Sequence, residues 1–337
     1  MPWRKTRDPY AVWLSETMLQ QTRAQTVVPY YERFLRELPT VRHLAEAPES
    51  RVLELWSGLG YYRRARMLQA AAQQMVESFG GALPSELADL RRLKGVGAYT
   101  AGAVASIAFG RAAAVVDGNV ARVLSRIFAL EDDVKSTRGI AKLWALAEQL
   151  VEEVGPAEAG EWNQALMELG ATVCQPRKPR CGECPAAPFC EGRALGIAET
   201  LPRASPKRKP TPVGRVAVVL ASARGVLLAR RRTDVLFGGL WEPPSADAEP
   251  AGLGDLAARL GLDAGSLEIA GEVIHVLSHR RLSVQVVRGA LGARRQWPLP
   301  GPDYDAIERV SLDTLAARAQ ASLARKVLAV AEVLPAV

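Results

Sequence analysis

The sequence predicts a multidomain protein in which an all-α domain is followed by an α+β domain. The chain has 337 residues, more than one domain of ordinary size requires. Through the first 200 residues, apolar side chains recur at spacings of three and four in segments separated by glycine and proline. Beyond a proline-rich stretch, short runs typical of strands replace this spacing. We therefore expect a helical domain at 1–197, a linker at 198–214 and an α+β domain at 215–337.

The composition excludes several classes of protein. Hydrophobic residues make up 48% and charged residues 23% of the chain, the balance of an ordinary globular protein, which argues against a disordered or fibrous one. No run of about eighteen apolar residues is present. Residues 1–5 lack the apolar core of a secretory signal. We expect a monomeric cytoplasmic protein without a membrane partner.

The net charge of +7 is compatible with binding to nucleic acid. Five of these charges come from residues 201–215, which contain four prolines and no acidic residue. This composition predicts an extended basic linker. The linker either is a solvated tether or contacts DNA or a protein partner.

Helix signals are clear near the N-terminus. Asp8 followed by Pro9 predicts an N-cap and a helix that continues to about Ala24. Pro29 predicts the start of a second helix that ends near Glu37.

In the second domain, the patterns predict strands at 216–220 and 226–229 joined by a turn at 222–225, a helix at 253–260, strands at 267–277 and 282–287, and a last helix at 312–333.

All four cysteines lie within residues 174–190, and they form the pattern C-x6-C-x2-C-x5-C. Disulfides are rare in the cytosol, so the pattern indicates a metal centre. Both zinc and an iron–sulfur cluster accept four thiolates. The spacing leaves both open, and the ligands in either case are Cys174, Cys181, Cys184 and Cys190.

Residues 93–101 place two glycines between the end of one predicted helix and the start of the next. Gly95 and Gly97 would let the backbone approach a phosphate, which the amides of the following helix attract. Lys94 adds a positive charge beside them. A helix C-cap followed by a turn is the plainer interpretation of the same residues.

Two carboxylates are candidate catalytic groups. Glu16 shares a helix face with Val12 and Leu19, and burial there would raise its pKa, as a general acid near neutral pH requires. Asp117 stands where a new helix is predicted to start, so it is either an N-cap alone or an N-cap with a catalytic role.

Five parts of the chain together resemble the helix-hairpin-helix DNA glycosylase superfamily that includes endonuclease III, and within it the MutY-type adenine DNA glycosylases. They are residues 13–22, 56–62, 93–101 and 116–120 and the cysteine spacing, which is similar to the family's 4Fe-4S loop. Residues 241–244 resemble a Nudix domain, but 256–262 contain no glutamate of the metal-binding Nudix box. We therefore expect a Nudix-like domain that recognises a base and does not hydrolyse pyrophosphate.

The resemblance assigns chemistry to four residues. It implies that Glu16 protonates adenine, that Asp117 stabilises the positive charge on the sugar, and that Tyr99 and Asn119 assist at the same sugar. Relatives that also cleave the strand carry a lysine at the position of Tyr99, where it forms a Schiff base. Tyrosine cannot do so, which predicts a monofunctional glycosylase.

The resemblance also implies a set of DNA contacts. The flipped adenine would contact Trp3 and Arg4, and its approach would be lined by Leu19 and Gln20. The base stack would be wedged open by Gln21 and Tyr61, and 8-oxoguanine would be contacted by Thr22, Leu59 and Ser278, with His279 as a further candidate base contact. Phosphate would be bound by Lys94, Gly95 and Gly97. Leu277 replaces the phenylalanine that the family carries before Ser278.

The expected partner is double-stranded DNA that contains adenine opposite 8-oxoguanine or guanine, with association with the nucleoid if the protein is bacterial. A repair protein is a further expected partner through the linker. Two other functions remain open from the residues: a bifunctional endonuclease III-like glycosylase and lyase, and a non-catalytic sensor of mismatches or redox state.

Overall fold

The computed structural model describes residues 1–203, 205, 209–249 and 252–335, and the chain divides into two compact units. The first unit comprises Met1–Ala47 and Arg66–Lys207, and the second comprises Pro48–Ala65 and Arg208–Val337. A short segment of the N-terminal half thus packs as part of the C-terminal unit. Among the described residues, every helix is too short or too polar to cross a membrane.

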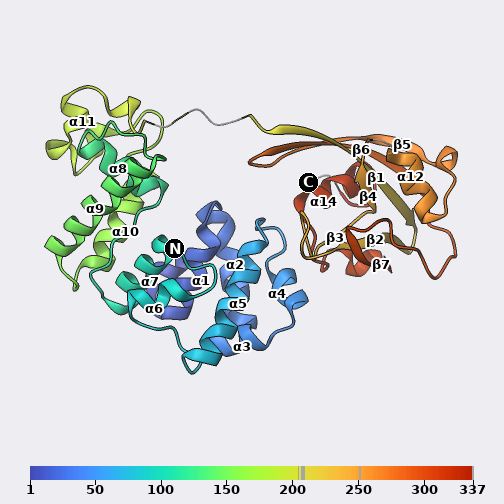
Figure 1. Ribbon diagram of the computed structural model, residues 1–337, viewed down its shortest axis with the longest axis horizontal. Coiled ribbons are helices and arrows are strands. Elements are labelled where there is room, and N and C mark those ends of the chain that lie inside the picture. The colour runs from blue at the N-terminus through green and yellow to red at the C-terminus, as the bar shows by residue number, and fades with distance from the viewer. Residues whose placement is uncertain (204, 206–208, 250–251, 336–337) are drawn as a thin grey trace. The chain divides into compact units, whose positions relative to one another are not determined.

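The first unit is helical, as predicted (Figure 1). Its α-helices are α1 (Pro9–Leu19), α2 (Ala24–Glu37), α3 (Val41–Glu46), most of α5 (Arg63–Ser78), α6 (Leu87–Arg92), α7 (Ala98–Phe109), α8 (Gly118–Ile127), α9 (Thr137–Val154), α10 (Ala159–Thr172) and α11 (Glu191–Ala194). Its 3-10 helices are η1 (Pro2–Lys5), η2 (Cys181–Glu183), η3 (Ala187–Phe189) and η4 (Ala198–Thr200).

Two helices form the centre of this unit. Residues 10–18 of α1 and residues 100–107 of α7 are all buried, so both helices are surrounded by protein on every side. They pack against each other, α7 also packs against α10, and α10 packs against α8. Residues on α1, α7 and α8 are thereby brought into one region.

The predicted extent of the first two helices was wrong. Helix α1 ends at Leu19 and not near Ala24, because Gln21 adopts a left-handed φ of 58° that interrupts the helix without a glycine to signal it. Pro29 lies inside α2 rather than at its start. The hydrogen bond that Pro29 removes is offset by burial of the apolar face of α2.

The second unit contains α4 (Glu49–Leu55), a mixed sheet and flanking helices. Its elements are β1 (Thr211–Ser222), β2 (Gly225–Arg231), β3 (Trp241–Glu242), β4 (Ser245–Asp247), α12 (Gly252–Leu260), η5 (Ala264–Ser266), β5 (Glu268–Val276), β6 (Arg280–Ala290), β7 (Tyr304–Val310), α13 (Leu312–Leu315) and α14 (Ser322–Val330). The strand order is β3-β2-β1-β6-β5, with β4 paired to β1 and β7 to β2. Strands β1 and β6 are parallel, and the other pairs are antiparallel.

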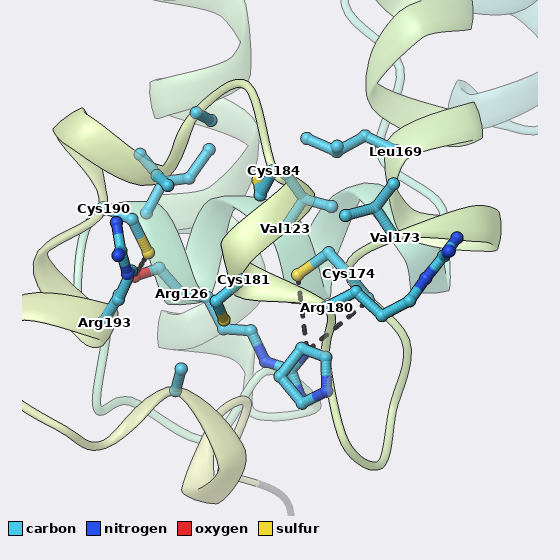
Figure 2. Close-up of a pocket in the computed structure, with 15 residues that line it drawn as sticks. Val123, Arg126, Leu169, Val173, Cys174, Arg180, Cys181, Cys184, Cys190 and Arg193 are labelled. Atoms are coloured by element: carbon cyan, nitrogen blue, oxygen red, sulfur yellow. Dashed lines mark hydrogen bonds between the residues drawn. The ribbon is translucent and has the colours of Figure 1, made fainter.

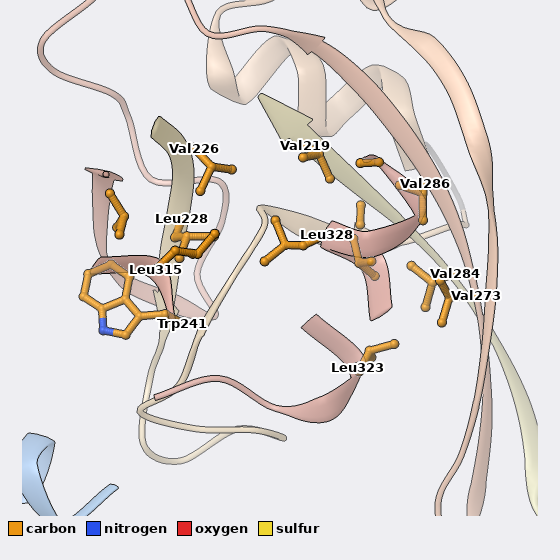
Figure 3. Packing of buried hydrophobic residues seen from close by; sticks show 14 of the residues in the cluster. Val219, Val226, Leu228, Trp241, Val273, Val284, Val286, Leu315, Leu323 and Leu328 are labelled. Carbon is orange, nitrogen blue, oxygen red and sulfur yellow. The ribbon is translucent and has the colours of Figure 1, made fainter. Parts of the chain in front are cut away.

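Alternate residues of β1 face opposite sides of this sheet. Ala217 and Val219 belong to an apolar cluster completed by Leu328 of α14, and Figure 3 shows these packed side chains. Val218 belongs to a second cluster, completed by Leu256 of α12. Helices therefore cover both faces, which confirms the α+β class predicted for this part of the chain.

Some elements of this unit differ from the prediction. Strands β1, β2, β5 and β6 and helix α12 match predicted segments, whereas β3, β4 and β7 were not predicted. The single helix expected at 312–333 is two helices, α13 and α14. Residues 316–321 separate them without a glycine or proline, so the sequence gives no sign of the break.

The predicted linker is partly structured. The backbone N–H of Val134 donates to the carbonyl of Arg203 at 3.1 Å, and the N–H of Ser205 donates to the carboxylate of Asp133 at 3.0 Å. Strand β1 begins at Thr211. Residues 204 and 206–208 of the predicted linker lie outside the described residues.

Candidate active site

Glu16 lies on α1 in the interior of the helical unit, and only 3% of its surface is exposed. The hydroxyl of Tyr99, at the start of α7, donates a hydrogen bond to its carboxylate. Burial raises the pKa of Glu16, and the nearby charge of Asp117 adds to this, while the Tyr99 hydrogen bond and the charge of Arg4 oppose it. The net effect favours the protonated acid that a general acid needs.

Tyr99 acts as a neutral hydrogen-bond donor in this arrangement. Burial raises its pKa well above 10, and the charge of Glu16 raises it further. The phenol therefore keeps its proton at neutral pH. Its hydroxyl also lies 3.5 Å from the sulfur of Met167 on α10, so the ring is fixed between three helices.

Asp117 is the N-cap of α8. One carboxylate oxygen accepts the backbone N–H groups of Asn119 at 2.9 Å and Val120 at 2.7 Å, and the other accepts the side-chain amide of Asn119 at 3.1 Å. These bonds satisfy the first N–H groups of α8 and hold the side chain at the positive end of the helix. Asp117 is therefore both an N-cap and a neighbour of Glu16, as its effect on the pKa of Glu16 shows.

Arg122 connects Asn119 to the cysteine loop, and sequence reasoning missed this role. Its guanidinium donates to the side-chain oxygen of Asn119 at 2.9 Å, to the carbonyl of Gly170 at 2.7 Å and to the carbonyl of Cys174 at 2.8 Å. An added Cβ at Gly170 would lie 2.7 Å from the Cβ of Asn119, so α8 and α10 touch here. The sequence signal that could have indicated this role is the position of Arg122, three residues after Asn119 and on the same helix face.

The four cysteines line one pocket, and Figure 2 shows them around it. Arg126 is 1% exposed and reaches the pocket from α8. The guanidinium of Arg126 donates to the sulfur of Cys174 at 3.3 Å and to the carbonyl of Gln175 at 2.7 Å. The thiol of Cys190 donates to the backbone carbonyl of Arg126 at 3.3 Å. Sequence reasoning also missed Arg126.

The helix-hairpin-helix segment lies between α6 and α7, as predicted. Gly95 has a φ of 74°, and an added Cβ there would lie 2.5 Å from the Cβ of Met67, so both conformation and space require glycine. An added Cβ at Gly97 would meet no atom within 4 Å, and Gly97 caps α7. With Lys94 exposed, the amides at the start of α7 are open to a phosphate.

The candidate base-contacting residues of the helical unit lie at the end of α1, directly after it, or in η1. Gln20 donates to the hydroxyl of Thr100 at 3.2 Å, while Gln21 is exposed. Trp3 is buried, with its ring packed edge-on against Tyr31 at 5.5 Å. Leu19, Thr22 and Arg4 are each partly buried.

The other candidate contacts lie in the second unit. Leu59 is 5% exposed, whereas Tyr61 is 53% exposed with a φ of 49°. The two predicted wedge residues, Gln21 and Tyr61, thus both adopt the left-handed backbone that is rare outside glycine and is often found at functional sites. Ser278 and His279 are exposed in the turn between β5 and β6.

Comparison with known proteins gives matches along most of the chain. Residues 14–149 match the model of the HhH-GPD superfamily of base excision DNA repair proteins, and residues 215–330 match that of the NUDIX domain. The human adenine DNA glycosylase is 40% identical over 86% of this chain and 64% of its own length. The mouse adenine DNA glycosylase is 40% identical over 86% of this chain and 68% of its own. The chain belongs to the adenine DNA glycosylase family.

A solved structure also resembles part of the chain. A thermostable thymine-DNA glycosylase matches 58% of this chain and 88% of its own, with 32% identity and a TM-score of 0.53. The chain spans about two thirds of the length of the mammalian adenine DNA glycosylases. The superfamily match contains Glu16, Tyr99 and Asp117, and the NUDIX match contains Ser278 and His279.

Proposed function

We propose that this chain is a monofunctional adenine DNA glycosylase that acts on adenine opposite 8-oxoguanine or guanine in double-stranded DNA. The observation that carries the proposal is the buried Glu16 carboxyl, bonded to Tyr99 and adjacent to Asp117. A raised pKa on one carboxyl and helix amides around the other prepare the pair for acid and charge-stabilising roles. The expected identity of the opposite base rests on the resemblance of Leu59, Thr22 and Ser278 to the family's 8-oxoguanine contacts.

The reaction follows from these two groups. Adenine leaves the duplex stack to reach them. Glu16 transfers its proton to adenine, and the bond between adenine and C1′ of the deoxyribose breaks with its electron pair on the base. Asp117 stabilises the positive charge that develops on the sugar. Water then adds at C1′ and returns a proton to Glu16, leaving an abasic site and free adenine.

Tyr99 distinguishes this proposal from an endonuclease III-like lyase. A lyase needs an amine that attacks C1′, and the residue beside Glu16 is a phenol that holds its proton. The strand should therefore remain intact after base loss. A non-catalytic sensor would need neither the buried acid nor the second carboxylate.

One experiment separates the three functions. The protein is incubated in excess over labelled duplexes that contain adenine opposite 8-oxoguanine, guanine or thymine, and samples are analysed with and without hot alkali. We expect cleavage of the first two duplexes after alkali only. Cleavage without alkali would indicate a lyase, no cleavage would indicate a sensor, and equal cleavage opposite thymine would refute the mispair specificity.

We also propose that the four cysteines hold a 4Fe-4S cluster, which would cross-link residues 174–190. A zinc ion with bonds of about 2.3 Å would bring four sulfurs to within about 3.8 Å of one another. Across the described residues, no three His, Cys, Asp or Glu side chains are arranged to hold one metal ion. Thiols spread around the wall of one pocket suit a group with several metal atoms better than a single ion.

Elemental analysis tests the cluster. We expect about four iron atoms per chain, inorganic sulfide, and visible absorption in the purified protein. Cys184→Ala should lose most of the iron, whereas Phe189→Ala, which changes a neighbouring side chain that is 79% exposed, should keep it. One zinc per chain without iron would refute the proposal.

A further inference from the structure

Residues 56–62, here called the probe loop, are held in one shape by side chains of the loop and its neighbours. Trp56 donates from its indole N–H to the carbonyl of Gly60 at 3.1 Å. Arg64 donates to the same carbonyl at 3.2 Å, and its guanidinium lies over the ring of Trp56 at 5.4 Å. The hydroxyl of Tyr62 accepts the N–H of Gly58 at 3.2 Å. These contacts fix the loop that presents the two candidate base contacts of this segment.

The probe loop is bonded to the segment before α14. Tyr62 donates from its hydroxyl to the carbonyl of Gln320 at 2.5 Å. The hydroxyl of Ser57 accepts the guanidinium of Arg325 at 3.1 Å and lies 3.4 Å from the N–H of Gln320. Ser57 and Tyr62 are each 8% exposed, and Gln320 is 2% exposed. Because these groups are shielded from water, each hydrogen bond depends on its partner being in place.

The partner segment is itself anchored to the sheet. The carbonyl of Ala319 accepts the backbone N–H of Trp241 on β3 at 2.9 Å, and the guanidinium of Arg318 lies over the Trp241 ring at 5.1 Å. The conformation of residues 318–320 is therefore tied to β3.

Helix α14 continues this path to the turn that carries Ser278. Leu323 and Val327 of α14 are in the same apolar cluster as Val273 of β5, as Figure 3 shows for Leu323 and Val273. Strand β5 ends at Val276, two residues before Ser278. One packed path therefore joins the candidate 8-oxoguanine contact of the Nudix-like domain to the probe loop.

We propose that Ser57 and Tyr62 are positioning residues that couple the probe loop to the Nudix-like domain, so that contact of Ser278 with the opposite base sets the loop for an 8-oxoguanine mispair. The inference rests on the proposed function, because it assumes that Leu59, Tyr61 and Ser278 meet the mispair. Neither Ser57 nor Tyr62 needs to touch DNA. Their hydroxyls act through the backbone of the loop and of the segment before α14.

The hydroxyl groups can be removed without removing the fold. Tyr62→Phe keeps the buried ring and deletes the hydroxyl that bonds Gly58 and Gln320. Ser57→Ala deletes only the acceptor for Arg325 and Gln320. In full-length protein, we expect each variant to bind an uncleavable adenine analogue opposite 8-oxoguanine about fivefold to tenfold more weakly, with less than a twofold change opposite guanine. The single-turnover rate at saturating protein should stay unchanged for both duplexes.

A double-mutant cycle tests the coupling across the contact. Arg325→Ala should reproduce the effect of Ser57→Ala, and the double variant should lose no more than the larger single loss. Lys326→Ala is the matched control, since it removes the same charge from the exposed face of the same helix. It should leave the preference for 8-oxoguanine unchanged.

Each result has one interpretation. Equal weakening for both duplexes, together with a lowered thermal midpoint, would show a merely structural contact and overturn the inference. So would unchanged preference in Tyr62→Phe and Ser57→Ala while the wild-type protein prefers 8-oxoguanine. If the wild-type protein showed no preference for 8-oxoguanine over guanine, the mispair specificity in the proposed function would be refuted. The proposed coupling between the probe loop and the Nudix-like domain would then be refuted as well.

Discussion

The hydroxyl of Tyr99 is hydrogen-bonded to the carboxylate of Glu16 inside the helical unit, although the two residues are on different helices. Burial and this hydrogen bond act in opposite directions on the acid. Burial destabilises the ionised carboxylate and raises its pKa, while the hydrogen bond stabilises the ionised form and limits that rise. Burial thus favours the protonated form that a general acid needs, and the hydrogen bond from Tyr99 keeps this effect smaller than burial alone would make it.

Tyr99→Phe tests this balance. Removal of the donor raises the pKa of Glu16 further. Because only the protonated acid can donate, the rate falls as pH rises through this pKa, and the midpoint of that fall should move to higher pH in the variant. The maximal rate should drop about 10- to 100-fold, since the carboxyl loses its orientation. Single-turnover rates between about pH 5 and about pH 9 measure both effects.

The control for this prediction is Tyr10→Phe, which removes another tyrosine hydroxyl from the same unit. The hydroxyl of Tyr10 donates to the carbonyl of Leu38 at 2.7 Å. Tyr10→Phe should lower stability by about 1 kcal/mol and leave the pH profile in place. An unmoved midpoint in Tyr99→Phe would show that the hydrogen bond does not act on the pKa of Glu16.

Glu16→Gln should separate stability from activity. A raised pKa means that folding favours the protonated carboxyl, so the wild-type protein loses stability as pH rises from the unfolded-state pKa through the folded-state one. Glutamine has no charge to bury, so the variant should gain stability over the wild-type protein as pH increases. Its activity should fall by about 10²- to 10⁴-fold, because the acid is gone.

Thermal midpoints across the same pH range check the stability effect. Glu32→Gln, a change on the exposed surface of α2, is the control and should follow the wild-type curve. A Glu16→Gln variant with the same pH dependence as the wild-type protein would contradict the assignment of a buried, protonated acid.

Asp117→Asn should impair catalysis much more than folding. Asparagine is as good an N-cap as aspartate, so the bonds to the N–H groups of Asn119 and Val120 can persist. The cost should be about 1 kcal/mol, because the new amide faces the amide of Asn119. The loss of the charge beside the sugar should slow base release about 10²- to 10³-fold. Asp8→Asn, the same change at the N-cap of α1, should have no effect on the rate.

Sequence reasoning located parts of this site for identifiable reasons. The spacing of Glu16 from Val12 and Leu19 placed it on a buried face, and it is 3% exposed. Asp117 before Gly118 indicated a helix start, and its side chain caps α8. Both features depend on local pattern. The contact between Glu16 and Tyr99 depends on the packing of α1 against α7, which no local pattern encodes.

The local sequence pattern did not predict the buried arginines or the packing of residues 48–65 with the C-terminal unit. Arg122 and Arg126 lie on an amphipathic helix where charge ordinarily indicates a solvated face, and their roles depend on carbonyl groups some 50 residues away. The association of residues 48–65 with the C-terminal unit likewise includes hydrogen bonds to residues far along the chain, Gln320 and Arg325. Strands β3 and β4 are too short to show an alternating pattern.

Arg122→Met should uncouple the cysteine loop from the carboxylate that faces the sugar. The side chain is buried, and its loss leaves the carbonyl of Gly170 without a charged donor and the carbonyl of Cys174 with only the longer bond from Arg126 at 3.4 Å. We expect a cost of about 2–4 kcal/mol, which corresponds to a fall of about 5–10 °C in the thermal midpoint. The rate should fall as well, since Asn119 is no longer held against Asp117.

Two further variants decide whether this effect comes from the geometry of the guanidinium. Arg122→Lys keeps the charge, but an ammonium group cannot reproduce a planar guanidinium in which Nη2 bonds Asn119 and Gly170 while Nε bonds Cys174. It should therefore recover little of the stability. Arg138→Met removes an exposed arginine paired with Asp132 and should shift the midpoint by about 1 °C or less. If Arg122→Met behaved like Arg138→Met, the connection from Asp117 through Asn119 and Arg122 to Cys174 would have no energetic weight, and the cysteine loop would be independent of the active site.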